Sequence, residues 1–253
     1  MSGKSRSLVF GLHAARSALE HAPENVVRAW LSGREDQRIA PLLEMLKARG
    51  IPVEFPDRKR LDRMADGQPH QGVALEVVLP PERGESELFQ ALQDAPAPAL
   101  LLVLDQVQDP HNLGACLRSA DATGALGVVV PRDQSVGLTP TVCKVASGAA
   151  ETVPLYRVTN LARTLRELKD AGLWIVGAAG EAERTAYETD LTMPLALVMG
   201  AEGKGLRRLT REYSDLLVKL PMLGRVESLN LSVATGVLLY EVLRQRAAAV
   251  KKC

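Results

Sequence analysis

The chain has 253 residues, of which 46% are hydrophobic and 24% charged, and its formal net charge is +1 at pH 7. This balance is typical of a globular protein, and it excludes a disordered chain and a helical membrane protein because no apolar run approaches bilayer length. The near-neutral charge gives no bulk signal for nucleic acid, so RNA binding has to be argued from particular residues.

Residues 1–79 alternate between strand-like and helix-like segments. Apolar and β-branched runs predict strands over 8–10, 26–31, 51–55 and 72–79. Helical spacing predicts helices over 13–20 and 39–46. Gly50 follows the second of these helices, where a helix would end. The pattern predicts a small α/β domain.

Residues 80–99 have a different composition. Two prolines and Gly84 precede a short helical stretch over 87–92, and alternating Ala and Pro follow over 95–99. Proline removes a backbone donor and stiffens the chain. We therefore expect residues 80–99 to link two domains.

From residue 100 to residue 253 the alternation of strands and helices is stronger. The predicted strands cover residues 100–107, 126–130, 153–158, 173–177, 195–199 and 216–220. The predicted helices cover 112–123, a segment begun by Thr139 and Pro140, a segment with Leu161, Leu165 and Leu168 on one stripe, and 231–246. Such alternation predicts a parallel sheet covered by helices on both faces.

The closing helix, residues 231–246, carries apolar residues on more than one face. A helix of this kind is buried in a core or in a subunit interface. Spacing alone favours the core.

Cysteine and histidine usage points away from disulfides and metals. Cys116, Cys143 and Cys253 are few and scattered, and the four histidines share no ligand spacing, so we expect no metal site. The start of the chain, residues 1–7, lacks the apolar segment of a signal peptide. We therefore expect a cytoplasmic protein.

Familiar nucleotide and hydrolase motifs are missing. No G-x-G-x-x-G follows a strand, the glycines at 200–205 lack the Lys-Ser/Thr of a phosphate loop, and there is no G-x-S-x-G elbow. A dinucleotide enzyme, a P-loop enzyme and a serine hydrolase are thus disfavoured.

Three polar segments, 104–121, 197–206 and 220–234, each follow a predicted strand. Ligand sites of parallel α/β sheets lie beyond the carboxyl ends of strands. Singly, each segment has a structural interpretation: Asn112 as a helix cap, Arg118 as a surface ion-pair partner, the glycines as turn residues, and Ser228 and Asn230 as caps. Together they predict a functional site.

The blocks 109–118, 199–206 and 228–234 resemble the three motifs of the SpoU (TrmH-type) RNA 2′-O-methyltransferases of the SPOUT superfamily. Residues 9–14 and 70–73 resemble the two ends of an L30e-like substrate-binding domain. The resemblance implies an L30e-like RNA-binding domain over 1–79 and a parallel-sheet methyltransferase domain with a deep trefoil knot over 100–253. It also implies S-adenosylmethionine as cofactor and a homodimer, for which the broad apolar closing helix is suited.

The resemblance is strongest to the branch that methylates a guanosine in the peptidyl-transferase loop of 23S rRNA. It implies cofactor contacts at Gly200, Leu220, Met222 and Leu229. It implies active-site roles for Asn112, Arg118, Glu202, Ser228 and Asn230. The acceptor would be a ribose 2′-hydroxyl, which DNA lacks.

Two roles stay open for Arg118. The resemblance implies a base assisted by an RNA phosphate, but a guanidinium has a pKa above about 12. The alternative is a fixed cation that orients the ribose and stabilises developing negative charge.

Three further alternatives stay open. The substrate could be transfer RNA or another ribosomal site. The chain could be a non-catalytic RNA-binding or ribosome-assembly protein, although a binding-only descendant could lose the active-site residues. The basic residues of 58–60 and Arg63 could contact RNA phosphates or form a solvated helix face.

Overall fold

The computed structural model describes residues 6–32 and 36–250. Cys253 and residues 1–5, on which the expectations about disulfides and a signal peptide partly depend, lie outside these ranges. The chain divides into two compact units. Unit 1 comprises Met1–Pro81 with Leu138–Gly148, and unit 2 comprises Glu82–Gly137 with Ala149–Cys253.

Unit 1 contains a mixed four-stranded sheet in the order β1-β4-β2-β3. Its strands are β1 (Arg6–Phe10), β2 (Val26–Leu31), β3 (Val53–Glu54) and β4 (Val73–Val78). Its helices are α1 (Leu12–His21), α2 (Ala40–Ala48), α3 (Arg58–Ala65), α6 (Pro140–Ala146) and the short 3-10 helix η1 (Pro23–Asn25). Strands β1 and β2 are antiparallel to β4, and β3 is parallel to β2. The predicted α/β character of this region is confirmed.

Helix α3 was not among the predicted elements. Five of its eight residues are charged, so the two buried positions, Leu61 and Ala65, do not form a recognisable apolar stripe in the sequence. Asp57 fixes its start, because the carboxylate accepts a hydrogen bond from the backbone N–H of Arg60 at 2.8 Å. The predicted start of α6 is confirmed, since the Thr139 hydroxyl accepts from Val142 N at 3.2 Å.

Unit 2 is built on a seven-stranded sheet in the order β7-β6-β5-β10-β8-β11-β9. The strands are β5 (Leu100–Leu104), β6 (Gly127–Pro131), β7 (Leu155–Val158), β8 (Trp174–Ala178), β9 (Arg184–Thr185), β10 (Leu195–Met199) and β11 (Leu216–Lys219). Every pairing is parallel, which confirms the predicted parallel sheet. Residues of β5, β6 and β10 are buried throughout, as expected of central strands covered on both faces.

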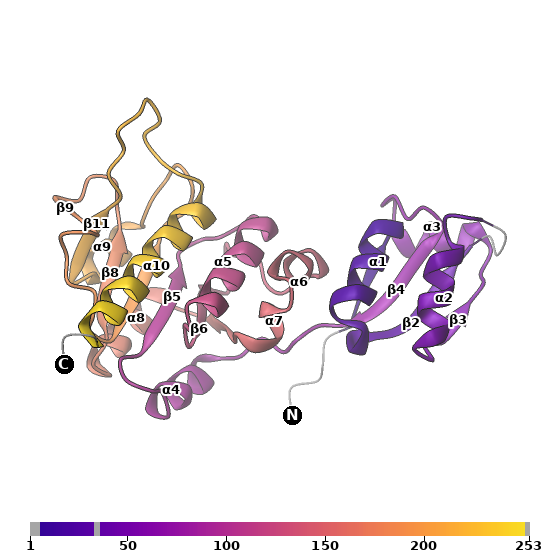
Figure 1. The fold of residues 1–253 in the computed structure, drawn as a ribbon, viewed down its shortest axis with the longest axis horizontal. Helices are drawn as coiled ribbons and strands as arrows, with labels where there is room; N and C mark the ends of the chain where they lie inside the picture. Colours follow the sequence, from indigo (N-terminus) through magenta and orange to yellow (C-terminus); the bar gives the residue numbers. More distant parts are fainter. Residues whose placement is uncertain (1–5, 33–35, 251–253) are drawn as a thin grey trace. The chain divides into compact units, whose positions relative to one another are not determined.

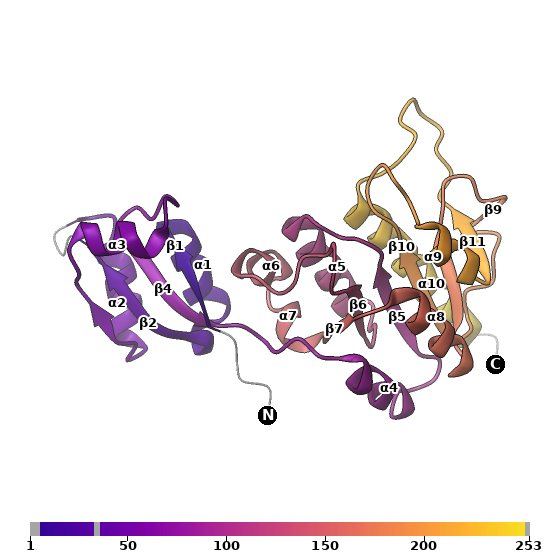
Figure 2. The same cartoon turned by 180° about the vertical axis from the view of Figure 1, so that it is seen from behind.

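Helices cover both faces of this sheet. They are α4 (Glu85–Gln93), α5 (Pro110–Ala122), α7 (Ala149–Thr152), α8 (Leu161–Asp170), α9 (Arg208–Tyr213) and α10 (Leu231–Val250). Helices α5 and α10 lie side by side on one face (Figure 1), whereas α8 and α9 lie on the other (Figure 2). The predicted stripe of α8 is confirmed, because Leu161, Leu165 and Leu168 are buried. No described helix has the length and apolarity to span a bilayer.

Part of the expected linker is ordered on unit 2. The backbone N–H of Arg83 donates to Leu155 O at 2.9 Å, and Arg157 N donates to Arg83 O at 2.8 Å. Leu88 of α4 is completely buried in the core of this unit. The apolar positions of α4 thus outweigh the flanking prolines, and the change from one unit to the other falls between Pro81 and Glu82.

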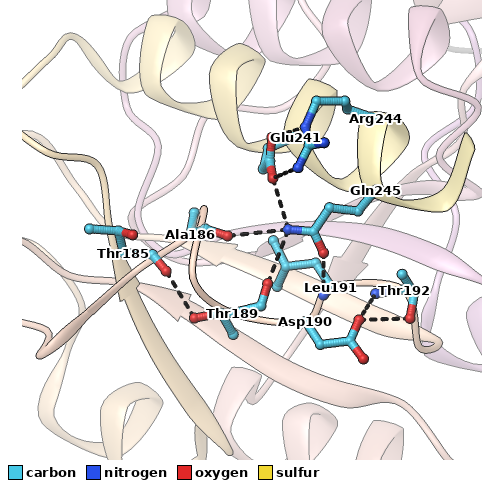
Figure 3. A network of polar contacts seen from close by, with 9 residues as sticks. All are labelled: Thr185, Ala186, Thr189, Asp190, Leu191, Thr192, Glu241, Arg244 and Gln245. Atoms are coloured by element: carbon cyan, nitrogen blue, oxygen red, sulfur yellow. Dashed lines mark hydrogen bonds and ion pairs between the residues drawn. The ribbon is translucent and has the colours of Figure 1, made fainter. Parts of the chain in front are cut away.

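The closing helix α10 is joined to the segment before β10 by the side chain of Gln245 (Figure 3). Gln245 Nε2 donates to Thr189 O at 3.0 Å and to Glu241 Oε1 at 2.8 Å, and Gln245 Oε1 accepts from Leu191 N at 2.8 Å. Arg244 donates two hydrogen bonds to the Glu241 carboxylate, and these lower the pKa of Glu241 below its usual value.

Candidate active site

The carboxyl ends of β5, β10 and β11 lie at one edge of the sheet, because its strands are parallel. Strands β5 and β10 are neighbours, and the Asp105 N–H donates to Met199 O between them at 2.8 Å. Only β8 separates β10 from β11. Strand β5 ends at Leu104 rather than at the predicted 107, because Gln106 has a positive φ of 71° that turns the chain. The three polar segments therefore leave the sheet at the same edge.

Asn112, Glu202 and Asn230 form one hydrogen-bonded cluster at this edge. Asn112 Nδ2 donates to Glu202 Oε1 at 3.2 Å, and Asn230 Nδ2 donates to the same oxygen at 2.6 Å. Asn230 Nδ2 also lies 3.0 Å from Asn112 Oδ1, to which it donates. The structure thus brings together three of the five residues expected in the active site, one from each polar segment.

Two helix starts hold the asparagines. Asn112 is buried in the first turn of α5, and the cap of that helix is Asp109, whose carboxylate accepts from His111 N at 2.9 Å. The interpretation of Asn112 as a cap is therefore wrong. Asn230 precedes α10 and does cap it, because its Oδ1 accepts from Ser232 N at 2.9 Å. Its amide nitrogen remains directed into the cluster.

Glu202 is the acceptor at the centre of the cluster. In addition to the two asparagine amides, its Oε1 accepts from Leu231 N at the start of α10 at 3.0 Å. A carboxylate at a helix N-terminus is stabilised by the helix dipole. Glu202 lies in a tight turn, which is closed by Ala201 N to Gly205 O at 3.1 Å and Gly205 N to Ala201 O at 2.9 Å. The turn and both helix starts are consequently fixed to one another.

Arg118 and Ser228 are not part of this cluster. Arg118 is exposed on α5, and Ser228 is exposed in the segment 221–230. Within the described ranges, neither side chain makes a hydrogen bond or an ion pair. Figure 1 shows the segment 221–230 as a loop that projects beyond the sheet between β11 and α10. Both side chains are thus available to an external ligand.

The expected cofactor residues lie on two pieces of backbone. At Gly200 a Cβ atom would lie 2.1 Å from the carbonyl carbon of Gly205, so only glycine fits there. Leu220 and Met222 are half-buried, and Leu229 is 39% exposed. In the described chain the backbone groups of residues 220–229 have no hydrogen-bond partners. A glycine turn beside a run of unpaired backbone groups fits a polar ligand bound mainly through the main chain.

Sequence reasoning missed Asp105, Arg207 and Thr210. Asp105 is buried directly after β5, and its Oδ2 accepts from Thr210 Oγ1 at 2.7 Å. The only signal in the sequence was an acidic residue immediately after an unbroken apolar run.

Cys116 offers no nucleophile, because burial raises the pKa of its thiol to about 12.

The fold and the cluster together define an α/β domain with a polar ligand site at the carboxyl edge of a parallel sheet. Residues 99–240 match the model of the SpoU rRNA Methylase family. Residues 8–82 match the model described as RNA 2′-O ribose methyltransferase substrate binding. The chain therefore belongs to the SpoU rRNA methylase family, as the three sequence blocks predicted.

Similar proteins cover nearly the whole chain. It is 54% identical over 244 residues to a Shewanella oneidensis protein named 23S rRNA (guanosine-2′-O-)-methyltransferase RlmB, covering 96% of this chain and 99% of that protein. The Haemophilus influenzae protein of the same name is 57% identical over 240 residues, covering 94% and 97%. The SpoU methyltransferase AviRb of Streptomyces viridochromogenes, solved in complex with AdoMet, has a TM-score of 0.67 at 25% identity, covering 96% of this chain and 91% of that one.

Proposed function

We propose that this protein transfers a methyl group from S-adenosylmethionine to the ribose 2′-hydroxyl of a guanosine in the peptidyl-transferase loop of 23S rRNA. The observation that carries the proposal is the cluster of Asn112, Glu202 and Asn230, which joins the three family motifs at one sheet edge. The names of relatives above 50% identity support ribosomal RNA and guanosine as the substrate.

Bound S-adenosylmethionine supplies an electrophilic methyl group, and transfer needs the ribose oxygen in line with the carbon–sulfur bond. Orientation of two reactants can contribute roughly 7–11 kcal/mol to lowering a barrier. The cluster serves this purpose because it fixes the Gly200–Leu206 turn against the starts of α5 and α10. Gly200, Leu220, Met222 and Leu229 would hold the cofactor, largely through backbone groups.

Arg118 and Ser228 would act on the RNA, since both are exposed beside the cluster segments and have no partner in the described protein. A guanidinium so placed orients the ribose and stabilises negative charge on the 2′-oxygen as its proton leaves. An RNA phosphate beside Arg118 is the group that could take up this proton. Glu202 Oε1 is less suited to that task, because three donors already occupy it.

RNA would also contact unit 1. Helix α3 presents Arg58, Lys59 and Arg63 to solvent, whereas Arg60 is paired with Glu54 at 3.3 Å. Within the described residues these three cations form no ion pair, and Arg63 Nε donates only to Lys59 O at 3.4 Å, so they can neutralise RNA phosphates without breaking an ion pair. Unit 1, together with the family-model match over 8–82, thus supports a role in RNA binding.

We also propose that the protein is a cytoplasmic homodimer whose second copy covers the outer face of α10. Val233, Val237 and Tyr240 lie one helical turn apart on that face, and they are 51%, 36% and 53% exposed. Aromatic and aliphatic residues exposed in a row are typical of subunit interfaces. The loops 200–206 and 220–230 would form the knot that the family resemblance implies.

The dimer is tested by light scattering after size-exclusion chromatography. The wild type should have twice the chain mass of 27.3 kDa. Val237→Glu should yield the monomer, and the control Tyr187→Glu, which changes an exposed aromatic residue outside α10, should remain dimeric. A wild-type monomer, or a dimer unaffected by Val237→Glu, would contradict this part of the proposal.

The function is tested with tritiated S-adenosylmethionine and 23S rRNA from a strain that lacks the modification. We expect label in the RNA, and mapping should place it on the 2′-oxygen of one guanosine. Label in transfer RNA alone would mean that transfer RNA, not 23S rRNA, is the substrate. Label on a base would mean that the protein methylates a base rather than a ribose 2′-hydroxyl. Absence of both cofactor binding and transfer would favour an RNA-binding protein without catalysis.

A further inference from the structure

Asp105 makes a set of contacts that the proposed chemistry does not use. Its side chain is completely buried at the carboxyl end of β5. Oδ2 accepts from Thr210 Oγ1 at 2.7 Å and from the backbone N–H of Arg207 at 3.2 Å. Oδ1 lies 2.6 Å from Arg207 Nε, an ion-pair contact in which no N–H points at the oxygen.

These contacts hold the end of the turn that carries Gly200 and Glu202. Arg207 is the cap residue of α9, and its own side chain makes no capping hydrogen bond. Asp105, which directly follows β5, contacts this helix start instead, because its carboxylate accepts from the backbone N–H of the cap residue Arg207 and from the hydroxyl of Thr210. The turn is therefore held by Glu202 at its tip and by Asp105 directly after its last residue, Leu206.

A buried carboxylate is a costly way to join two segments, and an apolar contact would serve stability as well. What the carboxylate adds is direction, since it binds a backbone N–H and a hydroxyl at fixed positions. The position matters because Gly200 packs so closely on Gly205 that no Cβ fits between them. A shift of this turn would move the backbone groups of Gly200, which face the proposed cofactor site.

We propose that Asp105 is a positioning residue for S-adenosylmethionine, which acts by fixing the Gly200–Leu206 turn through Thr210 and Arg207. This inference rests on the proposed function. It predicts that cofactor affinity depends on the contacts of Asp105 more strongly than on equally buried contacts elsewhere in unit 2.

The test uses calorimetric titration of the full-length protein with S-adenosylmethionine, and urea unfolding without it. Asp105→Ala removes all contacts, and Thr210→Val removes one hydroxyl while preserving shape, whereas Thr210→Ser restores that hydroxyl. Thr164→Ala is the matched control, because Thr164 is fully buried on α8 and its hydroxyl donates to Asn160 O at 3.1 Å.

We expect Asp105→Ala and Thr210→Val to raise the Kd by about tenfold or more, the loss typical of a hydrogen bond to a charged group. Thr210→Ser should bind within about twofold of the wild type, and Thr164→Ala should lose stability without a change in Kd. Should Asp105→Ala fail to fold, the two Thr210 variants decide the question.

Wild-type affinity in Thr210→Val, or an equal loss in Thr164→Ala, would overturn the inference and leave Asp105 with a purely structural role. A wild-type protein that does not bind S-adenosylmethionine at all is a different result, because it would overturn the proposed function itself. The two failures are thus distinguishable in one titration series.

Discussion

The sharpest perturbation of the cluster is Asn112→Asp, which keeps the shape of the side chain and changes one group. In the wild type Asn112 Nδ2 donates to Glu202 Oε1 at 3.2 Å. In the variant an oxygen takes the place of that nitrogen, so two carboxylate oxygens face each other with no proton between them. The favourable contact becomes a repulsion.

The magnitude follows from Coulomb's law. Two unit charges 3.2 Å apart repel by about 5 kcal/mol at an effective dielectric constant of about 20, and by about 1.3 kcal/mol in bulk water. Asn112 is buried, whereas Glu202 is exposed on one side. We therefore expect Asn112→Asp to lower the free energy of unfolding by about 2–3 kcal/mol at pH 7, between these limits.

The assay is urea unfolding from pH 7 to pH 4. A neighbouring negative charge raises the pKa of a carboxyl group, so the penalty is present above the raised pKa and is lost as the pH falls through it. The stability of the variant should accordingly approach that of the wild type in acid. Asn160→Asp is the control, because Asn160 caps α8, where a carboxylate is equally acceptable.

Two outcomes would refute this reasoning. One is an Asn112→Asp variant as stable as the wild type at pH 7, and the other is a stability loss that does not change with pH. Either would mean that Asn112 and Glu202 are not in contact in solution. The hydrogen-bonded cluster on which the proposed active site rests would then be contradicted.

Three further predictions concern other parts of unit 2. Arg118→Ala should abolish methyl transfer with little change in the Kd of S-adenosylmethionine. The control Arg166→Ala, on the opposite face of the sheet, should retain normal methyl transfer. Near-normal turnover of Arg118→Ala in a tritium assay would remove Arg118 from the mechanism. Gly200→Ala should lower the free energy of unfolding by about 1–3 kcal/mol through overpacking, while Gly180→Ala, where a Cβ meets nothing within 4 Å, should be neutral in urea unfolding. Because the pKa of Glu241 is lowered in the folded protein, the Glu241 carboxylate stabilises the fold above pH 4.5, and this stabilisation is lost as the pH falls. Glu241→Gln should therefore reduce the loss of unfolding free energy with decreasing pH. An unchanged pH dependence in that variant would exclude this contribution.

Much of the fold could be predicted where local pattern and tertiary burial agree. Strands 26–31 and 195–199 were predicted to the residue, because each is an apolar run bounded by polar residues or by proline and glycine. Helices α3 and α9 were missed, since in a short helix dense with charges the few buried positions do not form a readable stripe. Their formation depends on packing that only the folded chain supplies.

Part of the candidate site could likewise be predicted from the sequence, and part could not. The convergence of Asn112, Glu202 and Asn230 could be predicted, because parallel strands end at one edge and the motifs resemble a family. The contact between Asp105 and Arg207 could not, because it joins residues 102 positions apart and neither belongs to a recognised block. Long-range side-chain contacts of this kind leave no periodic signal.

The central claim is that the polar ends of β5, β10 and β11 hold a methyl donor, and a crystal structure with S-adenosylhomocysteine bound tests it most directly. We predict that the ligand lies against the backbone of Gly200 and of residues 220–229, beside an intact Asn112–Glu202–Asn230 cluster. Electron density for the ligand at any other edge of the sheet would contradict the account.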